Sequence, residues 1–150
     1  MGVKVVSPIR AYQMLKADPE HTFLVDCRTR PEYQFVGHPP MAYNIPYCFW
    51  SPDGKRENAY FVKDIMKRLE QAEKLLIICC SGQRSSKVCE ELVKNGFKEV
   101  FNIDKGFEGD KAEDINSIYY GYRRHLNGWQ HDGLPYTYEL KEGLAYKLNE

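Results

Sequence analysis

The sequence has no surplus of charge of either sign and no long apolar run. Lys and Arg together number 21, as do Asp and Glu, so the formal net charge is 0 at pH 7. A chain that binds nucleic-acid backbones normally carries a basic surplus, so we expect no nucleic-acid partner. The longest apolar stretch, residues 75–80, is far shorter than the roughly 20 apolar residues that span a bilayer. We therefore expect no membrane partner either.

Two further absences bear on compartment and cofactors. The first eight residues, Met-Gly-Val-Lys-Val-Val-Ser-Pro, contain no apolar segment typical of a secretory signal, which predicts a cytoplasmic location. The five cysteines are an odd number in a chain long enough to fold by burial alone, which favours free thiols over a disulfide framework. The sequence has no pair of Cys-x2-Cys motifs and no spaced Cys/His set, so we expect no metal and no cofactor.

The length and the order of the predicted elements indicate a single α/β domain over residues 1–150. Ser7-Pro8 is typical of a helix start, and Gly96 of a helix end. Apolar strands alternate with amphipathic helices, which predicts a central parallel sheet flanked by helices on both faces. Helices are predicted over 8–17, from about 58 onward and over 85–95; strands are predicted over 22–26, 75–79, 99–103 and, within the turn-rich residues 37–54, over 43–45.

Cys79 ends the most apolar predicted strand, and residues 79–85 (Cys-Cys-Ser-Gly-Gln-Arg-Ser) connect that strand to a helix. In parallel α/β sheets, ligands bind beyond the carboxyl ends of the strands, where loop N–H groups can converge on an anion. Residues 75–89 include no acidic residue, while Arg84 and Lys87 supply positive charge, which favours a reactive thiolate. The simpler alternative is that Cys79 is a small apolar residue closing a buried strand.

A set of motifs in the chain resembles the rhodanese family of sulfurtransferases. The loop Cys79-x-x-Gly82-x-Arg84-Ser85 fits the family's six-residue active-site loop, which opens with Cys and carries Gly at its fourth place. The resemblance covers roughly residues 7–136 and implies the same α/β fold. The other matching stretches are Leu24-Val-Asp26-Cys-Arg28-Thr29, Gly37-His38-x-Pro40-x-Ala42-x-Asn44-Ile45-Pro46, Leu92-x-x-x-Gly96-Phe97-x-x-Val100, Gly128-Trp129 and Gly133-Leu-Pro135.

The resemblance implies a sulfurtransferase that works through a cysteine persulfide. In the family, the loop cysteine takes a sulfane sulfur from a donor and passes it to an acceptor such as cyanide or another thiol. Carried over, Cys79 is the catalytic persulfide carrier, and Arg84 holds the anionic end of the donor. We expect a thiosulfate or persulfide donor and a thiol acceptor, either of which a protein can supply. The residues implied to bind the substrate, through their backbone N–H groups, are Cys80, Ser81, Gly82, Gln83, Arg84 and Ser85.

Departures from the family pattern leave the choice of substrate open. Met41, Pro39 and Lys105 replace residues that the family usually has near the site. Residues 110–127 form an insertion relative to the shortest members, and residues 137–150 extend beyond the usual end. The Tyr-rich part of the insertion, Tyr119-Tyr120-Gly-Tyr122-Arg-Arg124, predicts packing onto the domain or a surface for a protein partner rather than stacking on nucleobases.

Two other functions are alternatives. One is a non-catalytic rhodanese-like binding or regulatory module, although such modules usually lose the loop cysteine, which this chain keeps. The other is a cysteine-dependent phosphatase or arsenate reductase of related fold. Those enzymes use a longer Cys-x5-Arg loop that admits a tetrahedral oxyanion. Here Arg84 is the fifth residue after Cys79, so the spacing disfavours phosphate.

The remaining polar and thiol residues of the motifs are predicted to be structural. Asp26 and Arg28 are expected to form an ion pair at the edge of the sheet, and His38 a structural hydrogen bond. The other cysteines are predicted as follows: Cys27 and Cys89 in the core, Cys80 lining the loop rather than resolving a persulfide, and Cys48 buried in a loop or acting as a sulfur acceptor.

Overall fold

Five parallel strands form a central sheet within the residues that this computed structural model describes, 2–69 and 73–146. In the order in which they lie side by side, they are β1 (Lys4–Val6), β7 (Glu99–Ile103), β6 (Lys74–Ile78), β2 (Thr22–Asp26) and β3 (Tyr43–Asn44). The central strand β6 pairs along its whole length with β2, and Asp26 lies opposite Ile78. The sheet confirms the predicted α/β class.

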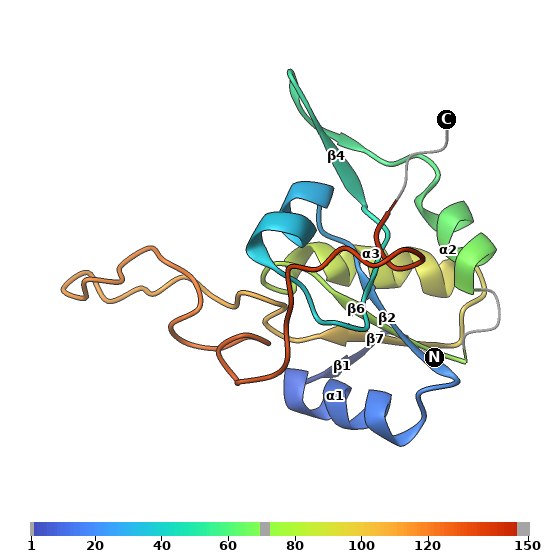
Figure 1. Cartoon of the computed structure of the whole chain (residues 1–150), viewed down its shortest axis with the longest axis horizontal. Helices are drawn as coiled ribbons and strands as arrows, with labels where there is room; N and C mark the ends of the chain where they lie inside the picture. The colour runs from blue at the N-terminus through green and yellow to red at the C-terminus, as the bar shows by residue number, and fades with distance from the viewer. Residues whose placement is uncertain (1, 70–72, 147–150) are drawn as a thin grey trace.

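Helices cover both faces of this sheet, as predicted (Figure 1). α1 (Pro8–Ala17) lies on one face, and α2 (Phe61–Leu69) and α3 (Gln83–Lys94) lie on the other. Ser7 caps the N-terminus of α1, because its Oγ accepts a hydrogen bond at 3.1 Å from the Arg10 backbone N–H in the first turn. α3 is followed by Gly96, whose φ of +99° is a left-handed value that glycine adopts readily. No helix among the described residues is long and apolar enough to cross a membrane.

The strands divide the interior into two apolar layers, because successive side chains of a strand point to opposite faces. Cys79 follows Leu75 and Ile77 into the layer on the α3 face. That layer contains Val25, Cys27, Ile45, Phe61, Ile65, Leu69, Leu75, Ile77, Cys79, Val88, Cys89, Leu92 and Val100. The layer on the α1 face contains Ala11, Leu15, Leu24, Tyr33, Ala42, Leu76, Ile78, Phe101, Ile103, Phe107 and Trp129.

The region expected to be mostly turns contains a hairpin. Besides the short strand β3, it includes β4 (Cys48–Ser51), which pairs antiparallel with β5 (Gly54–Glu57). Cys48 therefore lies on a strand rather than in a loop, and it is half-buried rather than buried. Most of β5 faces solvent, so no apolar alternation reveals the hairpin in the sequence. β1 and a short π-helical segment, Glu32–Val36, were likewise absent from the predicted elements.

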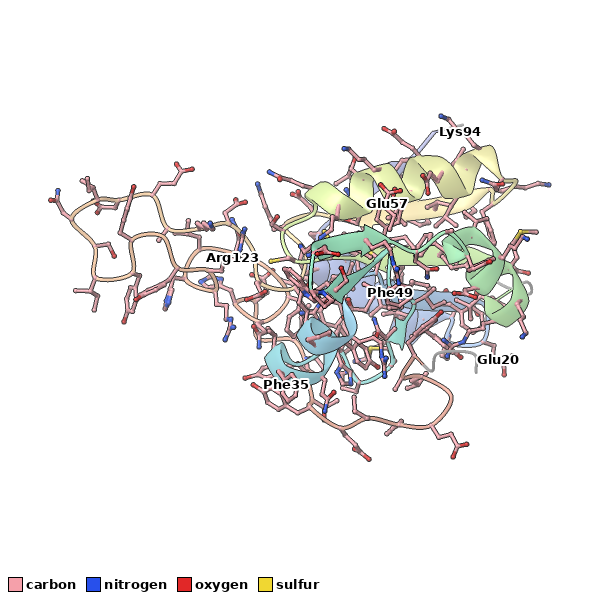
Figure 2. The ribbon with its side chains drawn as sticks, turned by 90° about the horizontal axis from the view of Figure 1, so that it is seen from above. Glu20, Phe35, Phe49, Glu57, Lys94 and Arg123 are labelled. Atoms are coloured by element: carbon pink, nitrogen blue, oxygen red, sulfur yellow. The ribbon has the colours of Figure 1, made fainter. Side chains whose placement is uncertain are left out.

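The predicted insertion, residues 110–127, extends away from the body of the molecule (Figures 1 and 2). Its tyrosines do not pack onto the domain, since Tyr120 is 55% exposed and Tyr122 is 63% exposed. The base of the segment is held instead by arginines: the Arg123 guanidinium donates to the Gly109 carbonyl at 2.7 Å. The surface area of 8847 Å² exceeds the roughly 7,900 Å² expected of a compact chain of this mass, in line with this protrusion.

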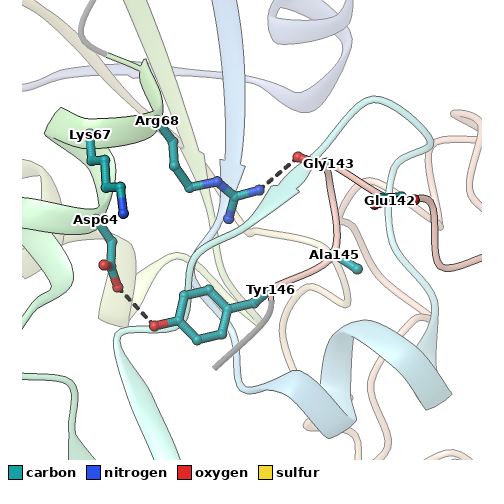
Figure 3. Close-up of a pocket in the computed structure, with 7 residues that line it drawn as sticks. All are labelled: Asp64, Lys67, Arg68, Glu142, Gly143, Ala145 and Tyr146. Atoms are coloured by element: carbon teal, nitrogen blue, oxygen red, sulfur yellow. Dashed lines mark hydrogen bonds between the residues drawn. The ribbon is translucent and has the colours of Figure 1, made fainter. Parts of the chain in front are cut away.

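The C-terminal segment runs back along the edge strand β3. Asn44 N–H donates to the Leu144 carbonyl at 2.9 Å, so the segment satisfies part of an otherwise open sheet edge. Figure 3 shows two further attachments to α2: Arg68 donates to the Gly143 carbonyl at 2.7 Å, and the Tyr146 hydroxyl donates to Asp64 at 2.9 Å. The last part of the predicted C-terminal extension, residues 147–150, lies outside the described residues.

Candidate functional site

Cys79 lies directly after the central strand β6, at the carboxyl end of the sheet. A loop of four residues, 79–82, joins β6 to α3, whose first residue is Gln83. The strand begins and ends one residue earlier than predicted and the helix begins two residues earlier, so Ser85 belongs to the first turn of α3. This turn lies above the Cys79 thiol, which is only 1% exposed. The topology thus places a buried thiol under the N-terminus of a helix.

The Cys79 sulfur is surrounded by hydrogen-bond donors from the start of α3. Gly82 N–H donates to Sγ at 3.0 Å and Ser85 N–H at 3.4 Å. These two amides belong to the predicted substrate-binding residues, and unpaired amides at a helix N-terminus stabilise negative charge. Gly82 has φ +96°, and a Cβ there would lie 3.2 Å from the Lys105 amide nitrogen. Glycine is therefore the residue that this turn accommodates.

A chain of polar side chains continues from the thiol to β7. The Cys79 thiol donates to Ser85 Oγ at 3.3 Å, and the Ser85 hydroxyl donates to Asn102 Oδ1. The Asn102 amide donates in turn to the Gly82 carbonyl at 3.3 Å. Sequence reasoning missed Asn102. Its signal was a polar residue between apolar Phe101 and Ile103, near the carboxyl end of the strand, where ligand-binding side chains gather.

A turn after β7 supports the backbone of the two loop cysteines. Phe107 N–H donates to the Cys79 carbonyl at 2.7 Å, and Glu108 N–H donates to the Cys80 carbonyl at 2.9 Å. Gly106 lies against the same peptide units: a Cβ there would clash with the Cys79 carbonyl oxygen and lie 2.8 Å from the Cys80 carbonyl carbon. The close approach of the turn that contains Gly106 therefore fixes the backbone position of Cys79.

The predicted anion-binding side chain, Arg84, is paired with a carboxylate. Its guanidinium donates to the two oxygens of Glu32 at 3.2 and 3.1 Å, and both side chains are half-buried. Burial lowers the pKa of Arg84, but the hydrogen bond and charge of Glu32, and smaller contributions from Cys27 and Cys79, raise it above its ordinary value. Burial raises the pKa of Glu32, but Arg84 brings it below its ordinary value. Both partners are therefore charged.

The neighbouring thiol, Cys80, faces a second carboxylate. Its Sγ donates to Glu108 Oε2 at 3.2 Å, and Glu108 Oε1 also accepts from the Arg124 guanidinium at 3.2 Å. Burial, followed by the charge and hydrogen bond of Glu108, raises the pKa of the Cys80 thiol to about 12. Cys80 is therefore a protonated hydrogen-bond donor at neutral pH, which agrees with its predicted lining role.

Comparisons with known proteins agree with this architecture. A family model for the rhodanese-like domain matches residues 7–113. The chain belongs to the rhodanese-like family. It is 37% identical over 92 residues to rhodanese-like domain-containing protein 17 and 38% identical over 89 residues to thiosulfate sulfurtransferase 18, both of Arabidopsis thaliana. These matches cover 60% and 58% of this chain, and 58% and 64% of the two plant proteins, so the chain spans less than two thirds of these relatives.

A solved structure extends the likeness to nearly the whole chain. The crystal structure of Rv0390 from M. tuberculosis superposes with a TM-score of 0.78 at 26% sequence identity. The superposition covers 93% of this chain and 100% of that protein. The structural similarity therefore includes more of the chain than the segment that the family model matches.

A buried ion pair at the end of β2 ties this strand to Gly37. The Arg28 guanidinium donates to Asp26 at 2.9 and 2.6 Å and to the Gly37 carbonyl at 2.6 Å, and both charged side chains are fully buried. This confirms the predicted ion pair. The predicted structural role of His38 also holds, since its Nδ1 lies 2.8 Å from the Tyr33 carbonyl and its ring stacks on Tyr33.

Two more thiols of the rhodanese-like domain lie in the layer that contains Cys79. Cys27 and Cys89 are both fully buried, as predicted, and Cys27 Sγ lies 3.5 Å from the Ile78 carbonyl. Burial, followed by the charge of Cys79, raises the pKa of each of these two thiols, that of Cys89 to about 12. At neutral pH they remain protonated apolar residues.

Side chains that can ligate a metal meet beside the loop. The ligand atoms of Glu32, Cys80 and Glu108 lie within 4.8 Å of one another. Each carboxylate already binds an arginine, and the Cys80 thiol is protonated, whereas metal binding requires a thiolate. We therefore interpret these three side chains as part of a hydrogen-bonded network of ion pairs and not as a metal site.

Proposed function

We propose that this chain is a sulfurtransferase that carries sulfane sulfur as a persulfide on Cys79. The observation that supports this proposal is the environment of Sγ, which accepts the amides of Gly82 and Ser85 at the N-terminus of α3. These donors stabilise the thiolate that attacks the donor and the persulfide anion that follows it. Thiosulfate sulfurtransferase 18, the plant relative with 38% identity, bears the name of this activity.

The cycle has two transfers and needs no further reactant. In the first, the Cys79 sulfur bonds to the outer sulfur of the donor and the donor's sulfur–sulfur bond breaks. Thiosulfate then leaves as sulfite, and a thiol persulfide leaves as the thiol. In the second, an acceptor thiol takes the outer sulfur as its own persulfide and Cys79 regains its thiol. Ser85 Oγ, 3.3 Å from Sγ, is placed to take the thiol hydrogen bond before attack and to turn its own hydrogen toward the sulfur afterwards.

A donor has to reach a thiol that is almost completely covered. Cys79 is 1% exposed, whereas Arg84 and Glu32 above the loop keep side-chain exposures of 24% and 20%. The donor therefore approaches from the side of this pair, and side chains of the loop shift to admit it. A small anionic or weakly charged donor fits this route better than a bulky one.

Mass spectrometry of the intact protein tests the proposal. Incubation with a sulfane sulfur donor should add the mass of one sulfur atom, cyanide should remove it, and peptide mapping should place it on Cys79. A persulfide on any other cysteine would overturn the assignment. The nearly complete burial of Cys79 favours a second candidate, a non-catalytic rhodanese-like module. If neither thiosulfate, an organic thiosulfonate nor a thiol persulfide loads sulfur onto the protein, the non-catalytic module is favoured over the sulfurtransferase.

A further inference from the structure

The arginine expected to hold an anionic donor is already occupied. Arg84 places two nitrogens on the two oxygens of Glu32 at 3.2 and 3.1 Å, across 52 positions of sequence. This bidentate geometry is the one that an arginine would use for the oxygens of thiosulfate. We propose that Glu32 is a specificity-determining residue that holds Arg84 and thereby selects donors of low charge, a thiol persulfide or a monoanion, over the thiosulfate dianion.

Glu32 is held in place independently of Arg84. Its Oε1 accepts hydrogen bonds from the Thr29 backbone N–H at 3.2 Å and from the Thr29 hydroxyl at 2.9 Å. It lies in the first turn of the π-helical segment Glu32–Val36, which follows directly on the loop after β2. The carboxylate therefore remains beside the site when a ligand competes for Arg84. A dianion has to displace a fixed carboxylate rather than a mobile one.

The ion pairs beside the loop offer a dianion no unpaired arginine. Glu108 accepts a hydrogen bond from the Cys80 thiol, and its charge is matched by Arg124 at 3.2 Å. Glu32 and Arg84 form the second pair, so the four side chains cancel. Arg28 is bound to buried Asp26. A donor that displaces Glu32 from Arg84 leaves this carboxylate unpaired within 4.8 Å of the Cys80 sulfur, where it repels a doubly negative donor more than a singly negative or neutral one.

This inference rests on the proposed sulfur transfer and adds the class of donor to it. With an organic thiosulfonate, the Cys79 sulfur bonds to the terminal sulfur, the sulfur–sulfur bond breaks and a sulfinate monoanion leaves. The thiolate and the monoanionic donor give a persulfide anion and the sulfinate monoanion, so atoms and charge balance. The same step with thiosulfate releases sulfite. Methanethiosulfonate has a methyl group where thiosulfate has a charged oxygen, so these two donors are similar in size and differ in charge, and they form a matched pair for measuring charge selection.

The test compares loading from thiosulfate and from methanethiosulfonate, followed by release of sulfite or sulfinate, for the wild type and Glu32→Gln. Wild type should use methanethiosulfonate with the higher kcat/KM. Glu32→Gln removes one charge and weakens the hold on Arg84, so kcat/KM for thiosulfate should rise about tenfold, through KM, with a much smaller change for methanethiosulfonate. A role of Glu32 in structure alone would change both donors alike, and that result would overturn the inference.

Two controls separate the pairing of Arg84 from the general loss of negative charge. Glu108→Gln removes the other carboxylate beside the Cys80 thiol but leaves Arg84 bound to Glu32. The increase in kcat/KM for thiosulfate should therefore be smaller than in Glu32→Gln. Glu32→Gln combined with Arg84→Gln should lose the gain. Equal gains in Glu32→Gln and Glu108→Gln, or a gain that persists without Arg84, would overturn the role of the pair. No loading in any variant from these two donors or from a thiol persulfide would overturn the proposed function itself, a result distinct from loading without charge selection.

Discussion

Cys79 and Cys80 are adjacent in the sequence but have opposite surroundings. Cys79 Sγ accepts the amides of Gly82 and Ser85, whereas Cys80 Sγ donates to the carboxylate of Glu108 at 3.2 Å. The first environment stabilises a negative sulfur, and the second keeps the thiol protonated with a pKa of about 12. The direction of the side chain from the end of β6, rather than the identity of the residue, thus decides which thiol is suited to carry sulfur.

The difference follows from the alternation of a strand. Cys79 continues the row of Leu75 and Ile77 that faces α3, so it points toward the amides at the start of that helix. Cys80 begins the turn, and its sulfur points toward the segment that follows β7, where Glu108 lies. Neighbouring thiols can therefore divide two tasks, one reactive and one structural, within one loop.

The largest expected effect separates the two cysteines directly. Cys79→Ser should reduce sulfur loading by about a thousandfold or more, because it removes the nucleophile. Cys80→Ser keeps a hydrogen-bond donor toward Glu108 and should retain loading within a fewfold of the wild type. Stopped loading reactions followed by intact-mass measurement give both rates. Comparable losses in the two variants would show that the surroundings do not distinguish the thiols as we describe.

The next effect tests the support beneath both cysteines. Gly106→Ala places a methyl group against the Cys79 carbonyl and 2.8 Å from the Cys80 carbonyl carbon, so the loop has to move. A displacement of about 1 Å can lower catalysis about a hundredfold, and we expect a loss of that order in sulfur loading. Gly96→Ala is the matched control, since Gly96 also has a positive φ, +99°, but no atom within 4 Å of its Cβ position.

Thermal unfolding completes this comparison of glycines. Both alanine variants should lower Tm, because alanine is strained at positive φ. Only Gly106→Ala should also lower loading in the fully folded protein. Loss of loading in Gly96→Ala at a temperature where it remains folded would mean that backbone strain anywhere in the fold disturbs Cys79, which would contradict a local role for Gly106.

A smaller effect concerns the hydroxyl beside Cys79. Ser85→Ala removes the group that lies 3.3 Å from Sγ and leaves Asn102 Oδ1 without this donor. We expect loading to fall about tenfold, the effect of one hydrogen bond to a charged group, together with a lower Tm. Ser86→Ala provides the control on the next residue of the helix. If the two variants load sulfur equally fast, the Ser85 hydroxyl has no role in the reaction.

Local patterns explain what the sequence predicted well. The helix over 8–17 and the strand over 99–103 have the predicted bounds, because a helix cap and an apolar run are encoded by neighbouring residues. The loop motif likewise predicted that Cys79, Gly82 and Ser85 come together. The partner of the Cys80 sulfur, Glu108, was not predicted.

The side chains at the site that the sequence did not predict come from residues far from the loop in sequence. Glu32 contacts Arg84 across 52 positions, Glu108 contacts Cys80 across 28, and Asn102 contacts Ser85 across 17. The acid-free stretch of residues 75–89 suggested a positive site, yet folding brings two carboxylates to it. Charge counted along a sequence therefore does not predict the charge around a site formed by the carboxyl ends of parallel strands.

The smallest expected effect concerns the reactivity of the Cys80 thiol, which should move toward that of a thiol without a carboxylate partner. Glu108→Gln removes the carboxylate that helps raise the pKa of Cys80 to about 12, while the larger contribution of burial remains. The Cys80 pKa should therefore fall only part of the way toward the ordinary value. Since the thiolate is the reactive form, alkylation of Cys80 by iodoacetamide at pH 9 should become a few times faster. The measurement uses Cys79→Ser as background, so that peptide mapping follows Cys80 without competition.

The pH dependence gives the sign of this effect. A raised thiol pKa means that the folded protein keeps its proton after the unfolded chain has lost it, so Cys80 lowers stability as pH rises from about 9 toward 12. Glu108→Gln should reduce this alkaline loss and shift the alkylation profile toward lower pH. An unchanged profile would mean that burial alone raises the Cys80 pKa, and Glu108 would then have no part in the contrast between the two thiols.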